Sequence, residues 1–174
     1  MTDRIYNEVN RIIRKYGIRD PFELLDAIGA VTRISHRYPP DGLKGYCTIM
    51  NRCKYAVING SLNETDRRVA AGHEAAHLIL HRAQLMGGPA RAMRDFDLYD
   101  GVRLAERQAN TFLADFLVTD ADALEAAAAA DDYFDAASEL CIPAPLFAFK
   151  LYSLARRGHP MRSPADLDSR FLRP

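Results

Sequence analysis

The sequence has no excess of charge of either sign. It contains 23 Lys and Arg residues and 23 Asp and Glu residues among 174, so the formal net charge is zero. A protein that binds nucleic acid by itself usually carries a basic excess, and we therefore expect no direct contact with nucleic acid. The two short basic pairs, Arg67-Arg68 and Arg156-Arg157, are most simply explained as solvated helix surface.

Long hydrophobic runs are also missing. No stretch approaches the roughly 18 apolar residues of a membrane-spanning helix. The first residues, MTDRIYNEVNRIIRKYG, are charged and amphipathic, without the apolar segment of a secretory signal. Cysteine is scarce, with only Cys47, Cys53 and Cys141 in the chain. Since the number is odd and no two of them form a CxxC pair, we expect reduced thiols and not a disulfide framework. We expect a soluble, cytoplasmic protein that contacts no membrane.

The length and composition of the chain fit one globular domain. The composition is 48% hydrophobic and 26% charged, typical of a chain with a core. We predict a single domain over residues 1–160, built from N-terminal helices (1–30), a small sheet (31–60), a long helix (64–82) and C-terminal helices (101–158). The proline-rich end, 161–174, is expected to be a flexible tail.

Periodicity predicts the individual elements. Apolar residues at helical spacing predict helices over 4–16 and 22–28. Three short segments rich in β-branched and aromatic residues, VTRIS, KGYCTIM and CKYAVIN, predict strands, with Asn51-Arg52 as a two-residue turn between the last two. We expect these strands to form a small antiparallel three-stranded sheet that packs on the long helix.

Helices dominate the rest of the chain. Asn63, with Asp66 three residues on, is predicted to cap the helix over 64–82. The segment 83–100 contains Gly87-Gly88-Pro89 and is expected to be an irregular connection, a candidate lid. Further helices are predicted over 101–118, 120–130, 132–140 and 144–157. The predicted fold class is α+β, mostly helical.

The long helix contains an HExxH motif, His73 to His77. Two histidines four residues apart lie on the same helix face, so both imidazoles can reach one ion. Glu74 is rotated by about 100° from His73 and can contact water without taking a coordination position. Two imidazoles and one carboxylate leave a position for water, as in catalytic zinc sites. We predict His73 and His77 as Zn²⁺ ligands and Glu74 as the catalytic base.

The surroundings of the motif are apolar. From Val69 to Leu80 only Gly72 and the three motif residues interrupt the apolar side chains, which is typical of a buried helix. Buried imidazoles and carboxylates need a partner, and a divalent cation is one. The competing interpretation is a chance match in which the histidines are satisfied core residues. Gly72 also suggests that a strand or a substrate backbone comes close to the helix there.

A third ligand is expected downstream. In GVRLAERQANTFLADFL, Glu106 lies at the edge of an apolar stripe, where a carboxylate needs a partner. The alternative is a surface Glu106 that pairs with Arg103 or Asn110.

Other residues compete for the ligand role. Asp95, Asp97 and Asp100 lie in the irregular connection, where rigid coordination is harder to arrange. His81 follows His77 by four residues, but imidazoles on three consecutive turns fan out too far to share one ion. We expect His81 either to contact a ligand residue from behind, outside the coordination sphere, or to lie at the surface.

The order of the segments YAVING, ETDRRVAAGHEAAHLILH, ERQANTFLADFL and IPAPLFAFKLYSLARRG resembles the ImmA/IrrE family of small metallopeptidases. The resemblance covers roughly residues 1–160, and its specific parts are the HExxH and ExxAN blocks. It implies a zincin-like domain in which His73, His77 and Glu106 bind zinc and Glu74 is catalytic. The sequence departs from the family at Ala75, where a bulkier residue is common.

The resemblance also implies a function. Family members cleave, or otherwise inactivate, helix-turn-helix repressors of mobile elements, phages or stress regulons, so a zinc-dependent endopeptidase with such a repressor as partner is expected. The alternative is a metal-containing regulatory protein that displaces the repressor without proteolysis, and a purely structural role is a third possibility. Tyr55, Tyr99 and His36 are open candidates for stabilising the oxyanion.

Overall fold

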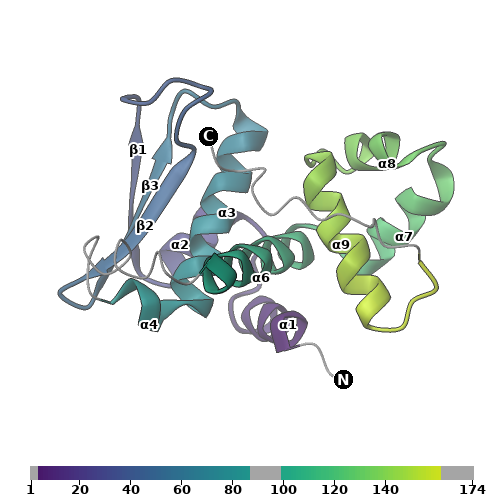
Figure 1. The fold of residues 1–174 in the computed structure, drawn as a ribbon, viewed down its shortest axis with the longest axis horizontal. Helices are drawn as coiled ribbons and strands as arrows, with labels where there is room; N and C mark the ends of the chain where they lie inside the picture. The colour runs from purple at the N-terminus through teal and green to yellow at the C-terminus, as the bar shows by residue number, and fades with distance from the viewer. Residues whose placement is uncertain (1–3, 87–98, 162–174) are drawn as a thin grey trace.

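The computed structural model describes residues 4–86 and 99–161. A three-stranded sheet lies at one end of the molecule, helices α7 to α9 lie at the other, and α3 and α6 lie between them (Figure 1). The α+β class expected from the sequence is confirmed. The elements, in chain order, are α1 (Arg4–Tyr16), α2 (Pro21–Ala27), β1 (Ala30–Ser35), β2 (Gly45–Met50), β3 (Cys53–Asn59), α3 (Glu64–Leu80), α4 (Arg82–Leu85), α6 (Tyr99–Leu117), α7 (Asp120–Ala129), α8 (Tyr133–Glu139) and α9 (Ala144–Arg156).

The hairpin between β2 and β3 forms as predicted. The two strands pair in an antiparallel manner, with Cys47 opposite Ala56. Asn51 and Arg52 have φ angles of 50° and 65°. Both lie in the left-handed region, which a two-residue hairpin turn of type I′ requires.

The expectation of a wholly antiparallel sheet was wrong, because the sheet is mixed. Its order is β1-β3-β2, and β1 runs parallel to β3, with Ala30 opposite Lys54. The connection 36–44 carries the chain from β1 past the central position to the far edge. The hairpin then returns β3 between the two, in the direction of β1. Ala56 and Ile58 of β3 are fully buried, which fits the central place of this strand.

Helix α3 begins as predicted and ends earlier than predicted. The side chain of Asn63 accepts a hydrogen bond from the backbone N–H of Asp66 at 2.8 Å. The helix stops at Leu80 and not at residue 82, and the separate four-residue helix α4 follows. The predicted irregular connection 83–100 is therefore helical at both of its ends, and residues 87–98 lie outside the described part. So does almost all of the predicted tail.

The close approach predicted at Gly72 exists, but neither a strand nor a substrate makes it. A Cβ atom at Gly72 would lie 2.3 Å from Cδ1 of Leu113 on α6 and 3.5 Å from the ring of Pro21 on α2. Gly72 therefore allows helices α3 and α6 to pack closely. The expectation was wrong because a glycine in a helix indicates contact without identifying the neighbour.

A buried ionic network joins α6 to α7 and α9. Lys150 on α9 is fully buried. Its Nζ atom lies 2.9 Å from Oδ1 of Asp115 and 2.7 Å from Oδ1 of Asp120. Ser153 donates to Oδ2 of Asp115 at 2.7 Å. Arg157 pairs with Asp120 as well. The network fixes the C-terminal helices against the helix that carries Glu106.

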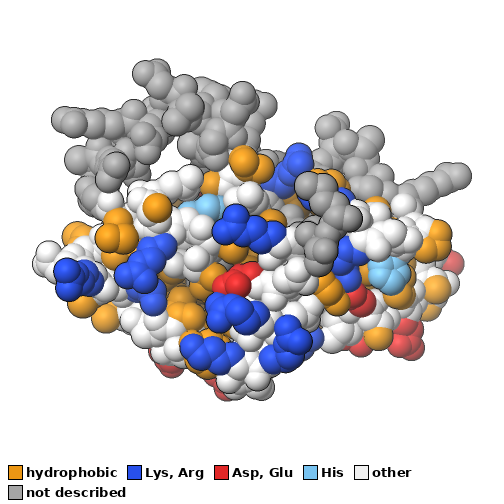
Figure 2. Space-filling view, turned by 90° about the horizontal axis from the view of Figure 1, so that it is seen from below, with side chains coloured by type: hydrophobic (Ala, Val, Ile, Leu, Met, Phe, Trp, Pro, Cys, Tyr) orange, Lys and Arg blue, Asp and Glu red, His pale blue; other side chains and the backbone are white. Residues whose placement is uncertain are grey.

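The balanced total charge is unevenly distributed along the chain. Residues 118–149 contain no Lys or Arg and seven acidic residues: Asp120, Asp122, Glu125, Asp131, Asp132, Asp135 and Glu139. Lys and Arg side chains are spread over the face seen in Figure 2, with hydrophobic and uncharged surface between them. None of the described helices combines the length and the hydropathy of a membrane span.

Candidate metal centre

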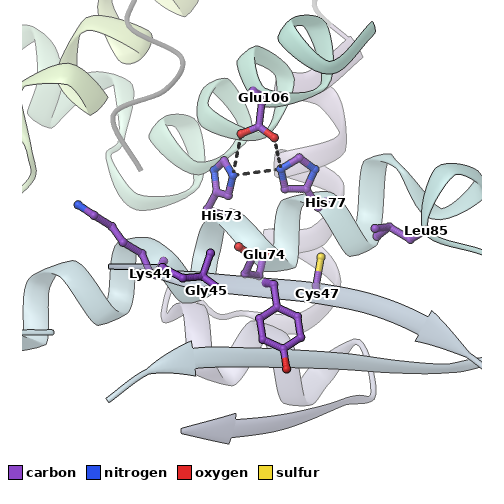
Figure 3. A pocket seen from close by; sticks show the side chains of 11 residues that line it. Lys44, Gly45, Cys47, His73, Glu74, His77, Leu85 and Glu106 are labelled. Atoms are coloured by element: carbon purple, nitrogen blue, oxygen red, sulfur yellow. Dashed lines mark hydrogen bonds and ion pairs between the residues drawn. The ribbon is translucent and has the colours of Figure 1, made fainter. Parts of the chain in front are cut away.

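Three of the predicted site residues converge on one point (Figure 3). The Nε2 atoms of His73 and His77, on α3, lie 3.0 Å apart. Oε2 of Glu106, on α6, lies 3.3 Å from Nε2 of His73, and Oε1 lies 3.6 Å from Nε2 of His77. The donor atoms of the three residues all lie within 4.8 Å of one another.

These distances fit one small divalent ion. Ligand atoms about 2.0–2.1 Å from a tetrahedral zinc ion lie about 3.3–3.4 Å from each other. The measured separations of 3.0, 3.3 and 3.6 Å bracket that value. Two nitrogen donors and one carboxylate are also the protein ligand set of many catalytic zinc sites. The residues therefore fit the metal that the sequence predicts.

Helix packing sets the distance between α3 and α6, the two helices that carry the three candidate donors. Gly72, which contacts Leu113, directly precedes His73. Leu113 lies two turns after Glu106 and thus on the same side of α6. A larger residue at position 72 would push the two helices apart close to the point where the donors meet, so this glycine supports the candidate metal centre indirectly.

Asn110 contacts His73 on the side away from the other donors. Its Oδ1 lies 2.8 Å from Nδ1 of His73, and its side chain is fully buried. From the sequence, Asn110 was weighed as a side-chain partner of a surface-exposed Glu106. Its position one turn after Glu106 is the signal that could have predicted the contact with His73, because residues four apart on a helix face the same neighbour.

His81 lies behind His77 and cannot share the same ion. Its Nδ1 atom lies 3.0 Å from Nδ1 of His77, which is the ring nitrogen that faces away from Glu106. Its Nε2 atom lies 3.0 Å from Oε1 of Gln108. His81 is only 7% exposed, which excludes a surface position. Gln108 was not singled out from the sequence.

Glu74 lies on the sheet side of the histidines, in a pocket of about 280 Å³. A Cβ atom at Gly45 would lie 3.3 Å from Cγ and Oε1 of Glu74, so the strand backbone and the carboxylate are close neighbours. The pocket opens between β2, α3, α4 and α6 (Figure 3). Its lining is formed by Leu43, Lys44, Gly45, Tyr46, Cys47, Ala70, His73, Glu74, His77, Leu85 and Glu106.

Burial and mutual charge shift the proton affinities in this pocket. Burial raises the pKa of Glu74, and the charge of Glu106 raises it further, against the opposing charge of His73 and the hydrogen bond from Cys47. Burial also raises the pKa of the Cys47 thiol, which therefore stays protonated near neutral pH. A carboxylate with a raised pKa is a stronger base, as proton abstraction requires.

The pKa of His73 is set by its neighbours more than by burial. Burial lowers its pKa, but the hydrogen bond to Glu106 and the charges of Glu74 and Glu106 outweigh burial, so that its pKa is raised. The site thus favours positive charge at the point where the two Nε2 atoms and the carboxylate meet. A bound cation would supply the same charge.

The remaining candidates fall elsewhere. Asp95, Asp97 and the side chains of Asp100 and Tyr99 lie outside the described residues. Tyr55 and His36 are not among the residues that line the pocket. The ring of His36 packs against Gly60 instead, where a Cβ atom would approach it to 2.5 Å.

The chain is similar to known proteins. A family model described as Peptidase M78, IrrE N-terminal-like domain, matches residues 49–156, which is more than half of the chain. The chain is also similar to "Uncharacterized immunity region protein 2" of Bacillus phage phi105, with 32% identity over 116 residues. The match covers 64% of this chain and 66% of that relative, slightly less than two thirds of its length. The chain belongs to the ImmA/IrrE family of metallopeptidases, peptidase family M78.

Proposed function

We propose that the protein is a zinc-dependent endopeptidase that cleaves a helix-turn-helix repressor of a mobile element, phage or stress regulon. His73, His77 and Glu106 would hold the zinc ion, and Glu74 would be the catalytic base. The observation that carries the proposal is the convergence of the three donors beside a buried carboxylate in an open pocket. Membership of a metallopeptidase family supports it.

The chain's own residues provide the proton transfers that peptide hydrolysis needs. His73, His77 and Glu106 would hold a zinc ion, which would supply Lewis acidity toward the scissile carbonyl and the attacking water. Glu74 accepts the proton of that water and passes it to the leaving amine. Burial raises the pKa of this carboxylate, which makes it a stronger base.

The edge of β2 is the proposed docking line for the substrate. Strand β2 pairs with β3 on one side, and its residues Gly45 to Cys47 line the pocket on the other. Within the described residues, that second side is met by a single bridge, from Met86 to Ile49. An extended peptide could therefore add to β2 as a strand and pass its scissile bond over Glu74.

The identity of the partner rests on the relative. That relative is a protein of a phage immunity region, and a phage repressor is accordingly the proposed substrate. Recognition of DNA would then belong to the repressor. Action on such a regulator would take place in the cytoplasm.

The experiment is incubation of the zinc-loaded protein with the repressor encoded beside its gene. We expect discrete fragments on a gel and none with Glu74→Gln, which should retain zinc. A repressor that leaves its operator in a gel-shift assay while staying intact would support the non-proteolytic alternative. Full turnover by Glu74→Gln would remove Glu74 from the mechanism.

A further inference from the structure

Gln108 and His81, which are not among the three candidate donors, form a chain of hydrogen bonds that ends on His77. Oε1 of Gln108 lies 3.0 Å from Nε2 of His81, and Nδ1 of His81 lies 3.0 Å from Nδ1 of His77. His81 comes from the end of α3 and Gln108 from α6, two residues after Glu106. The same two helices therefore provide both the donors and the groups behind them.

The chemistry of each group fixes the direction of these hydrogen bonds. The side-chain oxygen of Gln108 can only accept, so Nε2 of His81 donates to it. A neutral imidazole carries one N–H, which leaves Nδ1 of His81 as an acceptor. Nδ1 of His77 then donates to His81, and Nε2 of His77 keeps its lone pair. That lone pair faces His73 and Glu106.

His73 is held in the same form by a different group. Oδ1 of Asn110 accepts from Nδ1 of His73 and leaves Nε2 with its lone pair. The two ligand histidines thus receive matched support, a single amide for His73 and an amide acting through an imidazole for His77. Both arrangements select the tautomer that can bind a metal through Nε2.

We propose that His81 and Gln108 are positioning residues, which hold His77 in its Nδ1-protonated form and thereby raise the affinity of the centre for zinc. This inference rests on the proposed metal-binding function of His73, His77 and Glu106. Loss of such outer partners typically weakens metal affinity about 10–100-fold. The effect is transmitted through His77, because neither residue faces the point where the donors converge.

The test measures the zinc dissociation constant by competition with a chelator. His81→Leu removes the acceptor, and we expect affinity to fall about 10–100-fold. His81→Asn places a side-chain oxygen close to the position of Nδ1 and should restore most of the loss. The visible spectrum of the cobalt-substituted protein should shift in His81→Leu and return toward the wild type in His81→Asn.

Gln108 provides an independent arm of the test, should His81→Leu fail to fold. Gln108→Met removes the oxygen and should weaken zinc binding. Gln108→Glu keeps an oxygen, adds negative charge and should bind zinc at least as tightly as the wild type. Gln84→Met, at an exposed position of α4, is the matched control and should leave affinity unchanged.

Three results would overturn the inference. These are unchanged affinity in His81→Leu, equal weakening by His81→Asn and His81→Leu, and unchanged affinity in Gln108→Met. In each case the wild type still binds zinc and the proposed function stands. A wild-type protein that binds no zinc, with His73→Ala indistinguishable from it, would refute the proposed metal centre together with this inference.

Discussion

Oε2 of Glu106 lies 3.3 Å from Nε2 of His73, although the two residues belong to different helices. Glu106 is only partly exposed, and its second oxygen lies 3.6 Å from His77. One carboxylate therefore spans both imidazoles. This relationship is what a metal centre formed by two helices requires, and an HExxH motif that occurs by chance does not require it.

Glu106→Ala should strongly reduce zinc occupancy, because two imidazoles alone are too few to hold the ion tightly. Elemental analysis of the purified variant measures this directly. Glu125→Ala, at an exposed position on α7, is the control and should retain zinc at the wild-type level. Full zinc in Glu106→Ala would assign the third position to another group.

Gly72→Ala should be destabilising in the wild-type background and stabilising beside Leu113→Ala. The added methyl group would meet Cδ1 of Leu113 at 2.3 Å, and overpacking of this kind costs about 1–3 kcal/mol. Alanine otherwise gains about 1 kcal/mol over glycine inside a helix. Urea denaturation of the two single variants and the double variant measures the coupling. Additive effects would show that Gly72 and Leu113 do not limit the approach of α3 to α6.

Lys150→Met should lower the free energy of unfolding by about 3–5 kcal/mol, the usual effect of removing one partner from a buried ion pair. Lys150 is fully buried and bonds to Asp115 and Asp120, so the substitution removes the nearer of the two cations that these carboxylates share and leaves them Arg157, which lies 3.8 Å from Asp115. Arg156→Met, at an exposed site on the same helix, should change stability by no more than about 0.5 kcal/mol. Equal effects of the two would place Lys150 outside the stabilising network.

The contribution of Asp120 to stability should depend on acidity. Burial raises the pKa of Asp120, but hydrogen bonds from Arg157 and Lys150 outweigh burial and hold it well below its ordinary value of 3.8. A depressed pKa in the folded state adds stability above the unfolded pKa, and this contribution is lost as the pH falls toward the folded pKa. Asp120→Asn should therefore be less stable than the wild type at pH 7, with a smaller difference at pH 3. Urea denaturation at both values measures the two gaps, and a gap that widens in acid would contradict the assignment.

Local patterns in the sequence were sufficient to predict the longer helices and to bring together the candidate donors, but not to predict the four-residue helix α4. Hydrophobic spacing predicted α1, α3 and the helices after residue 99 to within two residues of their observed ends, because each buries one continuous face. The HExxH spacing brought His73 and His77 together, and the edge of an apolar stripe identified Glu106. Their roles as ligands, and that of Glu74 as base, remain predictions. So does the single-domain organisation over residues 1–160.

Features that depend on how elements meet could not be predicted. The parallel pairing of β1 with β3 follows from the path of a connection, which leaves no pattern within either strand. The contacts of Gln108 and Asn110 depend on the rotation of α6 against α3. A sequence shows that such amides lie near Glu106, but not which histidine each one reaches.

The bare backbone at position 45 offers a way to sort relatives by inspection. A Cβ atom there would lie 3.3 Å from the Glu74 carboxylate, so a larger residue should displace this proposed proton acceptor while leaving the three proposed zinc ligands in place. Chains with a bulky residue at this point should keep their metal but lose their hydrolytic power. The residue at this one strand position would then distinguish relatives that hydrolyse a protein partner from relatives that only bind it.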